Sequence, residues 1–134
     1  MDNVIEILCN VKKEIYLRIK ELSDITIQKQ LWLNQDNNTG EISSYTELMC
    51  TLYDDLDFHS FAKKGIIVVN NEEITDGKMS KALLKEMQIL DNMLQAYNAP
   101  GDDSSVLVDS AWHKITHQAS VVVNLWNKDS SLLT

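Results

Sequence analysis

The chain has few of the residues that interrupt regular structure or cross-link it. Its 134 residues include only four glycines, one proline and two cysteines. All-β sandwiches and barrels need a turn about every 8–12 residues, so the shortage of glycine and proline favours helices. Cys9 and Cys50 form no CxxC pair that would suggest a metal or redox motif. We expect both to pack as small hydrophobic side chains.

Long apolar runs and an excess of basic residues are also absent. No segment approaches the roughly 18 apolar residues of a membrane-spanning helix. Lys12, Lys13 and Glu14 interrupt the first apolar segment, which is not typical of a signal peptide. The sequence pI is about 4.7, which is unfavourable for binding phosphates. We therefore expect a cytoplasmic protein that binds neither membranes nor nucleic acid.

Negative charge is concentrated in the middle of the chain. The formal net charge is -8, and residues 36–76 alone carry nine acids against two lysines, a net of -7. The flanking segments are nearly neutral, with five acids and five bases before this segment and six acids and five bases after it. Such an asymmetry predicts a face that attracts a cationic partner. The nine acids are Asp36, Glu41, Glu47, Asp54, Asp55, Asp57, Glu72, Glu73 and Asp76.

Hydrophobic residues recur at three- and four-residue spacing along most of the chain, as in amphipathic helices. The pattern predicts helices over 3–22, from Ser23 or Asp24 to 33, over 44–64, from Thr75 or Asp76 to 97, and from 102–108 to 126. Ser44 and Glu47 have the spacing of a capping box, and Lys63-Lys64-Gly65 is a typical helix end. We expect a single all-α domain over 1–134 with about five helices, in an irregular bundle or stacked helical hairpins, and a frayed tail over 128–134.

The run Ile66–Val69 is the one segment whose residue types favour a strand. No comparable run lies nearby, so we interpret it as a buried connector that is extended or briefly helical. If it pairs as a strand, the fold becomes α+β, and Glu72 and Glu73 move with it.

No motif indicates catalysis or a cofactor. The chain lacks a G-x-S-x-G nucleophile motif and a glycine-rich phosphate loop. Asp109, His113 and His117 share a helix face and could ligate a metal, but the glutamate of a zincin motif is missing between the histidines. We interpret these histidines as solvated residues on a polar face. The prediction is thus a protein that is not an enzyme and has no cofactor or metal, with a helical metal-binding enzyme as the less favoured alternative.

The acids of residues 54–57 are flanked by aromatic residues, a composition typical of interface anchors and their polar rim. A solvated charged face would explain the same acids. On the binding hypothesis, the aromatic side chains are the anchors and the acids are the charged contacts. The predicted partner-binding residues are Tyr53, Asp54, Asp55, Asp57, Phe58, Glu72 and Glu73.

The stretch Ser44–Met49 that runs into Asp54–Phe58, and the final helix from Trp112 to Val123, resemble small acidic bacterial immunity proteins of contact-dependent growth inhibition or other polymorphic-toxin systems. The resemblance implies a cytoplasmic antitoxin that docks on the basic active-site cleft of a nuclease-like toxin and neutralises it stoichiometrically. An adaptor or regulatory module in another pathway would use the same acidic face.

Overall fold

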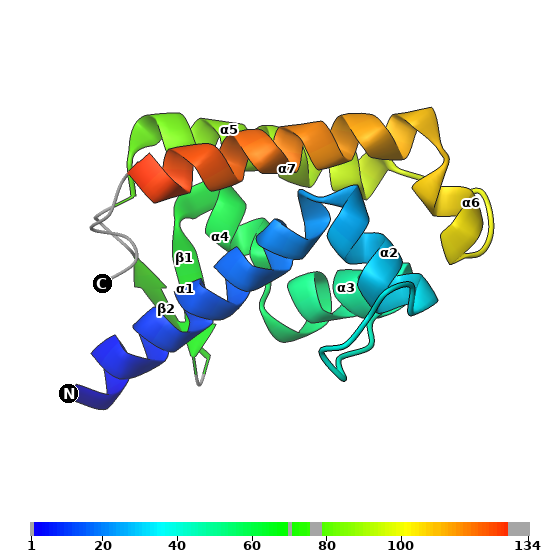
Figure 1. Ribbon diagram of the computed structural model, residues 1–134. Helices are drawn as coiled ribbons and strands as arrows, with labels where there is room; N and C mark the ends of the chain where they lie inside the picture. The colour runs from blue at the N-terminus through cyan, green and yellow to red at the C-terminus, as the bar shows by residue number, and fades with distance from the viewer. Residues whose placement is uncertain (1, 70, 76–78, 129–134) are drawn as a thin grey trace.

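The computed structural model describes residues 2–69, 71–75 and 79–128, which form one mostly α-helical domain with a small β hairpin (Figure 1). The elements in chain order are α1 (Asp2–Leu22), α2 (Ile25–Leu33), α3 (Tyr45–Cys50), the π-helix η1 (Thr51–Asp55), α4 (Phe58–Lys64), β1 (Ile66–Val69), β2 (Glu72–Thr75), α5 (Lys81–Ala96), α6 (Asp103–Leu107) and α7 (Ser110–Lys128).

Helices α5 and α7 lie side by side and form one layer of the domain (Figure 1). Helix α7 also packs against α1, and α4 packs against α5 and β1. Helices α2 and α6 contact each other at the end of the molecule that lies away from the hairpin (Figure 1). The core is therefore enclosed by helices from both halves of the chain.

The predicted hydrophobic stripes form this core. In α5, the side chains at three- and four-residue spacing are buried, as are those of α7. Full burial of each such side chain contributes about 1.5–3 kcal/mol, so the stripes supply most of the driving force for helix packing. The buried residues of the two stripes are Leu83, Met87, Leu90 and Leu94 in α5, and Trp112, Ile115, Ala119, Val122 and Trp126 in α7.

Helix boundaries follow the predicted caps in part. The Ser44 side chain accepts a hydrogen bond from the Glu47 N–H at 2.9 Å, and Gly65 ends α4 in the left-handed conformation with φ 66. The single helix expected over 44–64 is divided into α3, η1 and α4, because the chain forms a π turn and then a left-handed residue at Asp57, with φ 48. The predicted cap at Thr75 is wrong, since Ser80 caps α5. Asp76 lies outside the described residues.

The interpretation of Ile66–Val69 as a connector without a partner is wrong. This run is strand β1, and it pairs antiparallel with β2. Ile67 opposes Ile74 and is buried, whereas Val68 opposes Glu73 on the exposed side. Asn71, at φ 64, supplies the positive φ that a tight hairpin turn requires. Because Glu72 and Glu73 are charged, the residue types of this segment did not predict the second strand.

Two further expectations concern the cysteines and the C-terminal tail. Cys9 and Cys50 are both exposed free thiols, so the expectation that they pack in the interior is wrong. The tail expected to fray is described only at Lys128, which ends α7, and residues 129–134 lie outside the described residues.

A buried glutamine joins three helices. Gln28 of α2 is 0% exposed, and its Nε2 donates to the backbone oxygens of Glu21 and Leu22 at 3.1 and 2.9 Å. Its Oε1 accepts a hydrogen bond from Trp112 Nε1 of α7 at 2.8 Å. The carbonyls at the end of a helix lack partners within it. Gln28 supplies hydrogen bonds to two such carbonyls of α1 and also binds the Trp112 side chain of α7.

Substitution of Gln28 by leucine removes these three hydrogen bonds and leaves buried polar groups without partners. We expect the free energy of unfolding to fall by about 2–4 kcal/mol, measured by urea denaturation. The control is Gln30→Leu on the same helix, where we expect a change within about 0.5 kcal/mol. Equal effects of the two substitutions would contradict the assigned role of Gln28.

Candidate functional site

The acids predicted to contact a partner are exposed at two places. Asp54 and Asp55 lie in η1, Glu72 and Glu73 lie on β2, and all four are exposed. Asp57 is partly buried, and its carboxylate accepts a hydrogen bond at 3.3 Å from a backbone N–H in the first turn of α4. Asp57 therefore caps a helix, while the other four carboxylates are accessible to a partner.

The two predicted aromatic anchors occupy different environments. Phe58 is 0% exposed and belongs to the core, so it offers no surface to a partner. Tyr53 is partly exposed, and its ring packs edge-on against Phe58 at a centroid distance of 6.0 Å. The buried Phe58 ring thus packs against Tyr53, and of these two predicted anchors only Tyr53 reaches the surface.

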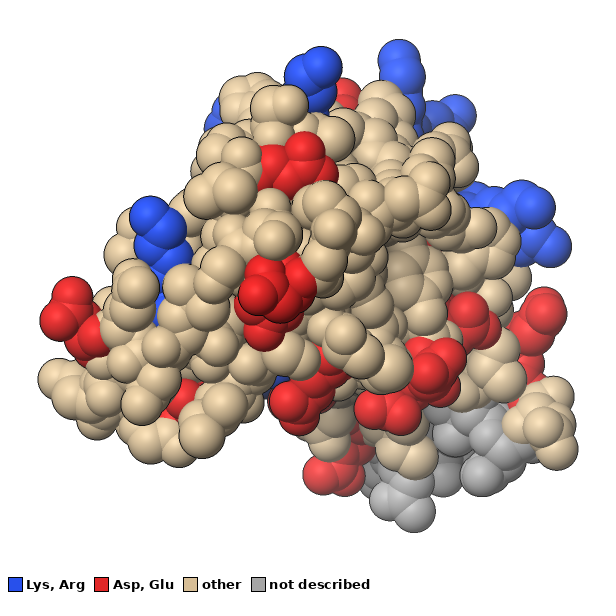
Figure 2. Space-filling model, turned by 90° about the vertical axis from the view of Figure 1, so that its right-hand side faces the viewer, with Lys and Arg blue, Asp and Glu red and all other residues tan. Residues whose placement is uncertain are grey.

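One face of the molecule carries many acidic side chains (Figure 2). Figure 2 shows this side, on which α2, α3 and α6 lie in Figure 1, with Asp and Glu spread over its middle and lower parts. Lys and Arg lie mainly toward its upper and outer edges (Figure 2). The exposed acids of residues 54–55 and 72–73 therefore belong to a surface on which acidic side chains are accessible to a partner.

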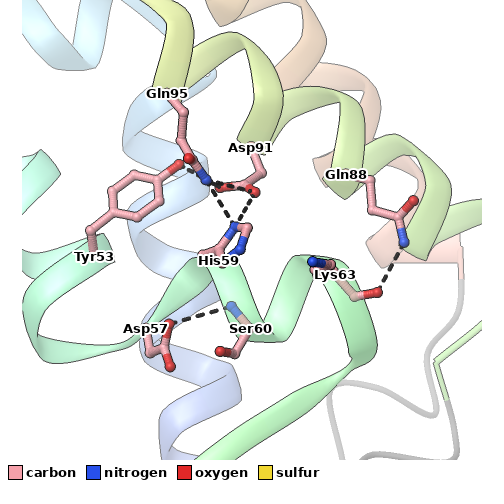
Figure 3. Close-up of polar contacts among 8 residues, drawn as sticks. All are labelled: Tyr53, Asp57, His59, Ser60, Lys63, Gln88, Asp91 and Gln95. Atoms are coloured by element: carbon pink, nitrogen blue, oxygen red, sulfur yellow. Dashed lines mark hydrogen bonds and ion pairs between the residues drawn. The ribbon is translucent and has the colours of Figure 1, made fainter.

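A buried carboxylate that the sequence analysis did not single out lies next to Tyr53 (Figure 3). Asp91 of α5 is 3% exposed. Its Oδ1 accepts hydrogen bonds from Tyr53 Oη at 2.8 Å and Gln95 Nε2 at 3.0 Å. Its Oδ2 lies 2.7 Å from His59 Nδ1 and 3.1 Å from Gln95 Nε2. We call Tyr53, His59, Asp91 and Gln95 the Asp91 cluster.

The hydrogen-bond network determines the orientation of His59. An ionised carboxylate is only an acceptor, so His59 Nδ1 must carry the proton that lies between it and Asp91. Gln95 Nε2 also lies 2.8 Å from His59 Nδ1, but it donates to the carboxylate, since two N–H groups cannot bond each other. A neutral His59 therefore presents the lone pair of Nε2 away from Asp91, on a side chain that is 47% exposed.

The π turn explains how η1 and α4 both reach Asp91. The Leu56 N–H donates a hydrogen bond of 3.0 Å to the Thr51 oxygen, five residues earlier. The corresponding bond of an α-helix spans four residues, so this turn holds one extra residue. Left-handed Asp57 then redirects the chain. Tyr53 and His59 consequently approach the same carboxylate from two helical segments, and π turns of this kind are frequent at functional sites.

A groove opens beside the cluster. It has a volume of about 390 Å³, comparable to small ligand sites of about 300–1,000 Å³. Residues at four-residue spacing on α3 and η1 line one side, residues of α5 line another, and His59 of α4 also contributes. We call it the tyrosine groove; it is lined by Tyr45, Met49, Tyr53, His59, Leu94 and Gln95.

The sequence contained a signal for the Asp91 cluster. Asp91 follows Met87 by four residues and precedes Leu94 by three, so it lies on the stripe that α5 buries. An acid at such a position must be hydrogen-bonded, because burial of an unpaired carboxylate is costly. Two of its partners, Tyr53 and His59, however, come from more than 30 positions away, and no local pattern identifies them.

The alternative metal site at Asp109, His113 and His117 is not assembled. Asp109 accepts a hydrogen bond from Tyr97 Oη at 2.7 Å, and His113 Nε2 bonds to the Leu107 oxygen at 2.7 Å. Both histidines are exposed, as the helical periodicity predicted. Within the described part of the chain, no three His, Cys, Asp or Glu side chains are grouped so that they could hold a metal ion.

Comparison of the chain with protein-family models, curated proteins and solved structures finds no match. None of the helices in the described ranges has the length and apolar character needed to cross a membrane. Function must therefore be inferred from the exposed acids Asp54, Asp55, Glu72 and Glu73, the Asp91 cluster and the tyrosine groove.

Replacement of Asp91 by asparagine tests the cluster. The amide replaces one carboxylate oxygen by an NH2 group that only donates, so it cannot accept from Tyr53, His59 and Gln95 together. We expect the free energy of unfolding to fall by about 2–4 kcal/mol in urea denaturation. The exposed neighbour Asn92 provides the control, since Asn92→Ala should change it by less than about 0.5 kcal/mol. A neutral Asp91→Asn variant would contradict the assigned network.

Alkaline pH gives a second test. Burial, followed by the hydrogen bond to Asp91, raises the pKa of Tyr53, and burial followed by the bond to Asp109 raises that of Tyr97. A raised pKa in the folded state contributes stability that is complete below the unfolded pKa of about 10 and is lost as pH rises above it. Each such tyrosine should lower the free energy of unfolding by up to about 1.4 kcal/mol per pH unit.

The measurement is urea denaturation at several pH values above and below 10. Tyr53→Phe should reduce the slope of stability against pH, since it removes one of the titrating groups. An unchanged slope would contradict the effect assigned to Tyr53.

Proposed function

We propose that this chain is a cytoplasmic bacterial immunity protein that binds and neutralises a cationic, nuclease-like toxin, without catalysis of its own. The observation that carries the proposal is the exposure of Asp54, Asp55, Glu72 and Glu73 within a segment of net charge -7. A nuclease active site is basic because it binds phosphates, so an acidic face is complementary to it.

Two of these acids are the stronger candidates for the contact. Asp54 and Asp55 have no ion pair with any described residue. Glu73 instead lines a pocket of about 150 Å³ together with Lys63 and Lys64, which offset its charge locally. The uncompensated charge of η1, next to the partly exposed ring of Tyr53, therefore supports η1 as the centre of the interface.

Charge and packing would contribute to binding in different ways. Exposed acids steer a basic partner and raise the association rate, and salt screens this effect over about 8 Å at physiological ionic strength. Burial of apolar and aromatic surface in the tyrosine groove would slow dissociation. The proposal thus expects association to depend on salt more strongly than dissociation does.

The test is protection of growing cells. The chain is co-expressed with the toxin domain encoded beside its gene, and growth is compared with that of cells that produce the toxin alone. We expect the wild-type chain to restore growth, and the double substitution Asp54→Lys/Asp55→Lys to weaken toxin binding by at least about 100-fold at 0.15 M salt. Asp57 is left unchanged because it caps α4.

The matched control is Asp36→Lys/Glu41→Lys, which makes the same change of charge in the exposed loop between α2 and α3. It should retain protection and most of the affinity. Absence of protection by the wild-type chain, or equal loss in both double variants, would overturn the proposal.

A further inference from the structure

The tyrosine groove combines aromatic faces with an apolar floor. Tyr45 and Tyr53 lie two helical turns apart on the wall formed by α3 and η1. Met49, between them in the chain, and Leu94 of α5 provide apolar contacts. Tyrosine faces attract cations, and methionine and leucine can cover an aliphatic chain. Such a groove is suited to a side chain with an apolar stem and a cationic head.

The polar atoms of the groove that have no partner can all accept hydrogen bonds. Among the described residues, Tyr45 Oη, Gln95 Oε1 and His59 Nε2 make no hydrogen bond. Gln95 uses its nitrogen toward Asp91, which leaves its oxygen available. In the neutral form of His59 the proton is on Nδ1, next to Asp91, and Nε2 is then an acceptor as well. A ligand rich in donors would satisfy these atoms.

The charge near the groove also favours a cationic ligand. Exposed Asp54 and Asp55 directly follow Tyr53 in η1, and the buried Asp91 carboxylate lies against the Tyr53 hydroxyl. These carboxylates do not line the groove, but their negative charge lies near it and disfavours an anion, and a purely apolar side chain would leave the acceptors without partners. The guanidinium group matches best, because it is planar, permanently charged and has five donors and no acceptor.

We propose that the tyrosine groove binds an arginine side chain of the basic partner. The arginine stem lies along Met49 and Leu94, and its guanidinium stacks on a tyrosine ring and donates to Tyr45 Oη, Gln95 Oε1 and His59 Nε2. This inference rests on the proposed function for the source of the arginine, but the groove can be tested with small probes alone. The buried Asp91 carboxylate holds Tyr53, His59 and Gln95 in position through its hydrogen bonds.

A second cavity is less suitable. It has a volume of about 330 Å³ and lies between α5 and α7, where Tyr97, Asp109 and Lys114 contribute to its lining. The Asp109 carboxylate already accepts hydrogen bonds from Tyr97 Oη and from a backbone N–H, and Lys114 brings a positive charge. This cavity therefore lacks the uncompensated negative charge found near the tyrosine groove.

The experiment uses methyl NMR of the full chain with ¹³C-labelled methionine. Met49 lines the tyrosine groove and Met93 lines the second cavity, so the protein contains its own control. The probes are the N-acetyl methylamides of arginine, lysine and norleucine. We expect the arginine probe to shift the Met49 signal saturably, with a Kd on the order of 1 mM, and to leave Met93 unchanged. Norleucine should bind at least about 10-fold more weakly, and lysine about 3-fold more weakly.

Two variants examine the assigned contacts without disturbing the core. Tyr45→Phe keeps the ring and removes a hydroxyl without a described partner, and should weaken the arginine probe about 3-fold. Asp54→Asn/Asp55→Asn should weaken it about 3- to 10-fold at low salt, whereas Asp36→Asn/Glu41→Gln should leave it unchanged.

Three results would overturn the inference: no Met49 shift up to about 50 mM arginine probe, equal affinity for norleucine, or equal affinity for lysine. These results are independent of the growth assay. Protection with a silent groove would contradict only the arginine site, and arginine binding without protection would contradict only the immunity function.

Discussion

The hydrogen bonding of the buried Asp91 carboxylate is the constraint on which the surface of this protein depends. A carboxylate that is 3% exposed must have partners, and α5 supplies only Gln95. The other partners, Tyr53 and His59, come from η1 and α4. The need to satisfy one buried charge therefore holds three helical segments together, and it places a tyrosine ring, an imidazole and an amide around one groove.

The core itself depends on more ordinary packing. Helix α7 lies between α1 and α5 and contributes two fully buried tryptophans, and Gln28 ties the end of α1 to Trp112. This arrangement leaves the acids of residues 54–55 and 72–73 on the outside, where water solvates them. The proposed function thus separates two tasks: apolar stripes and buried polar groups determine the fold, and exposed acids beside a preformed groove provide recognition.

Local patterns were reliable where a single helix face decides the structure. The stripes of α5 and α7, the Ser44 cap and the Gly65 helix end all follow from contacts within a few residues. Predictions failed where distant partners decide. Strand β2 carries two glutamates and becomes a strand only through its pairing with β1. Phe58 resembled an interface anchor beside acids, but tertiary packing buries it completely.

The amino-acid sequence by itself determined the mostly helical class, the buried stripes and the concentration of negative charge, because these depend on composition and short-range periodicity. Only the tertiary structure decided which acids are unpaired at the surface, that Asp91 is buried, and that its partners meet beside a groove. The physical reason is that hydrogen bonds between Asp91 and residues more than 30 positions away exist only after α4, η1 and α5 have packed.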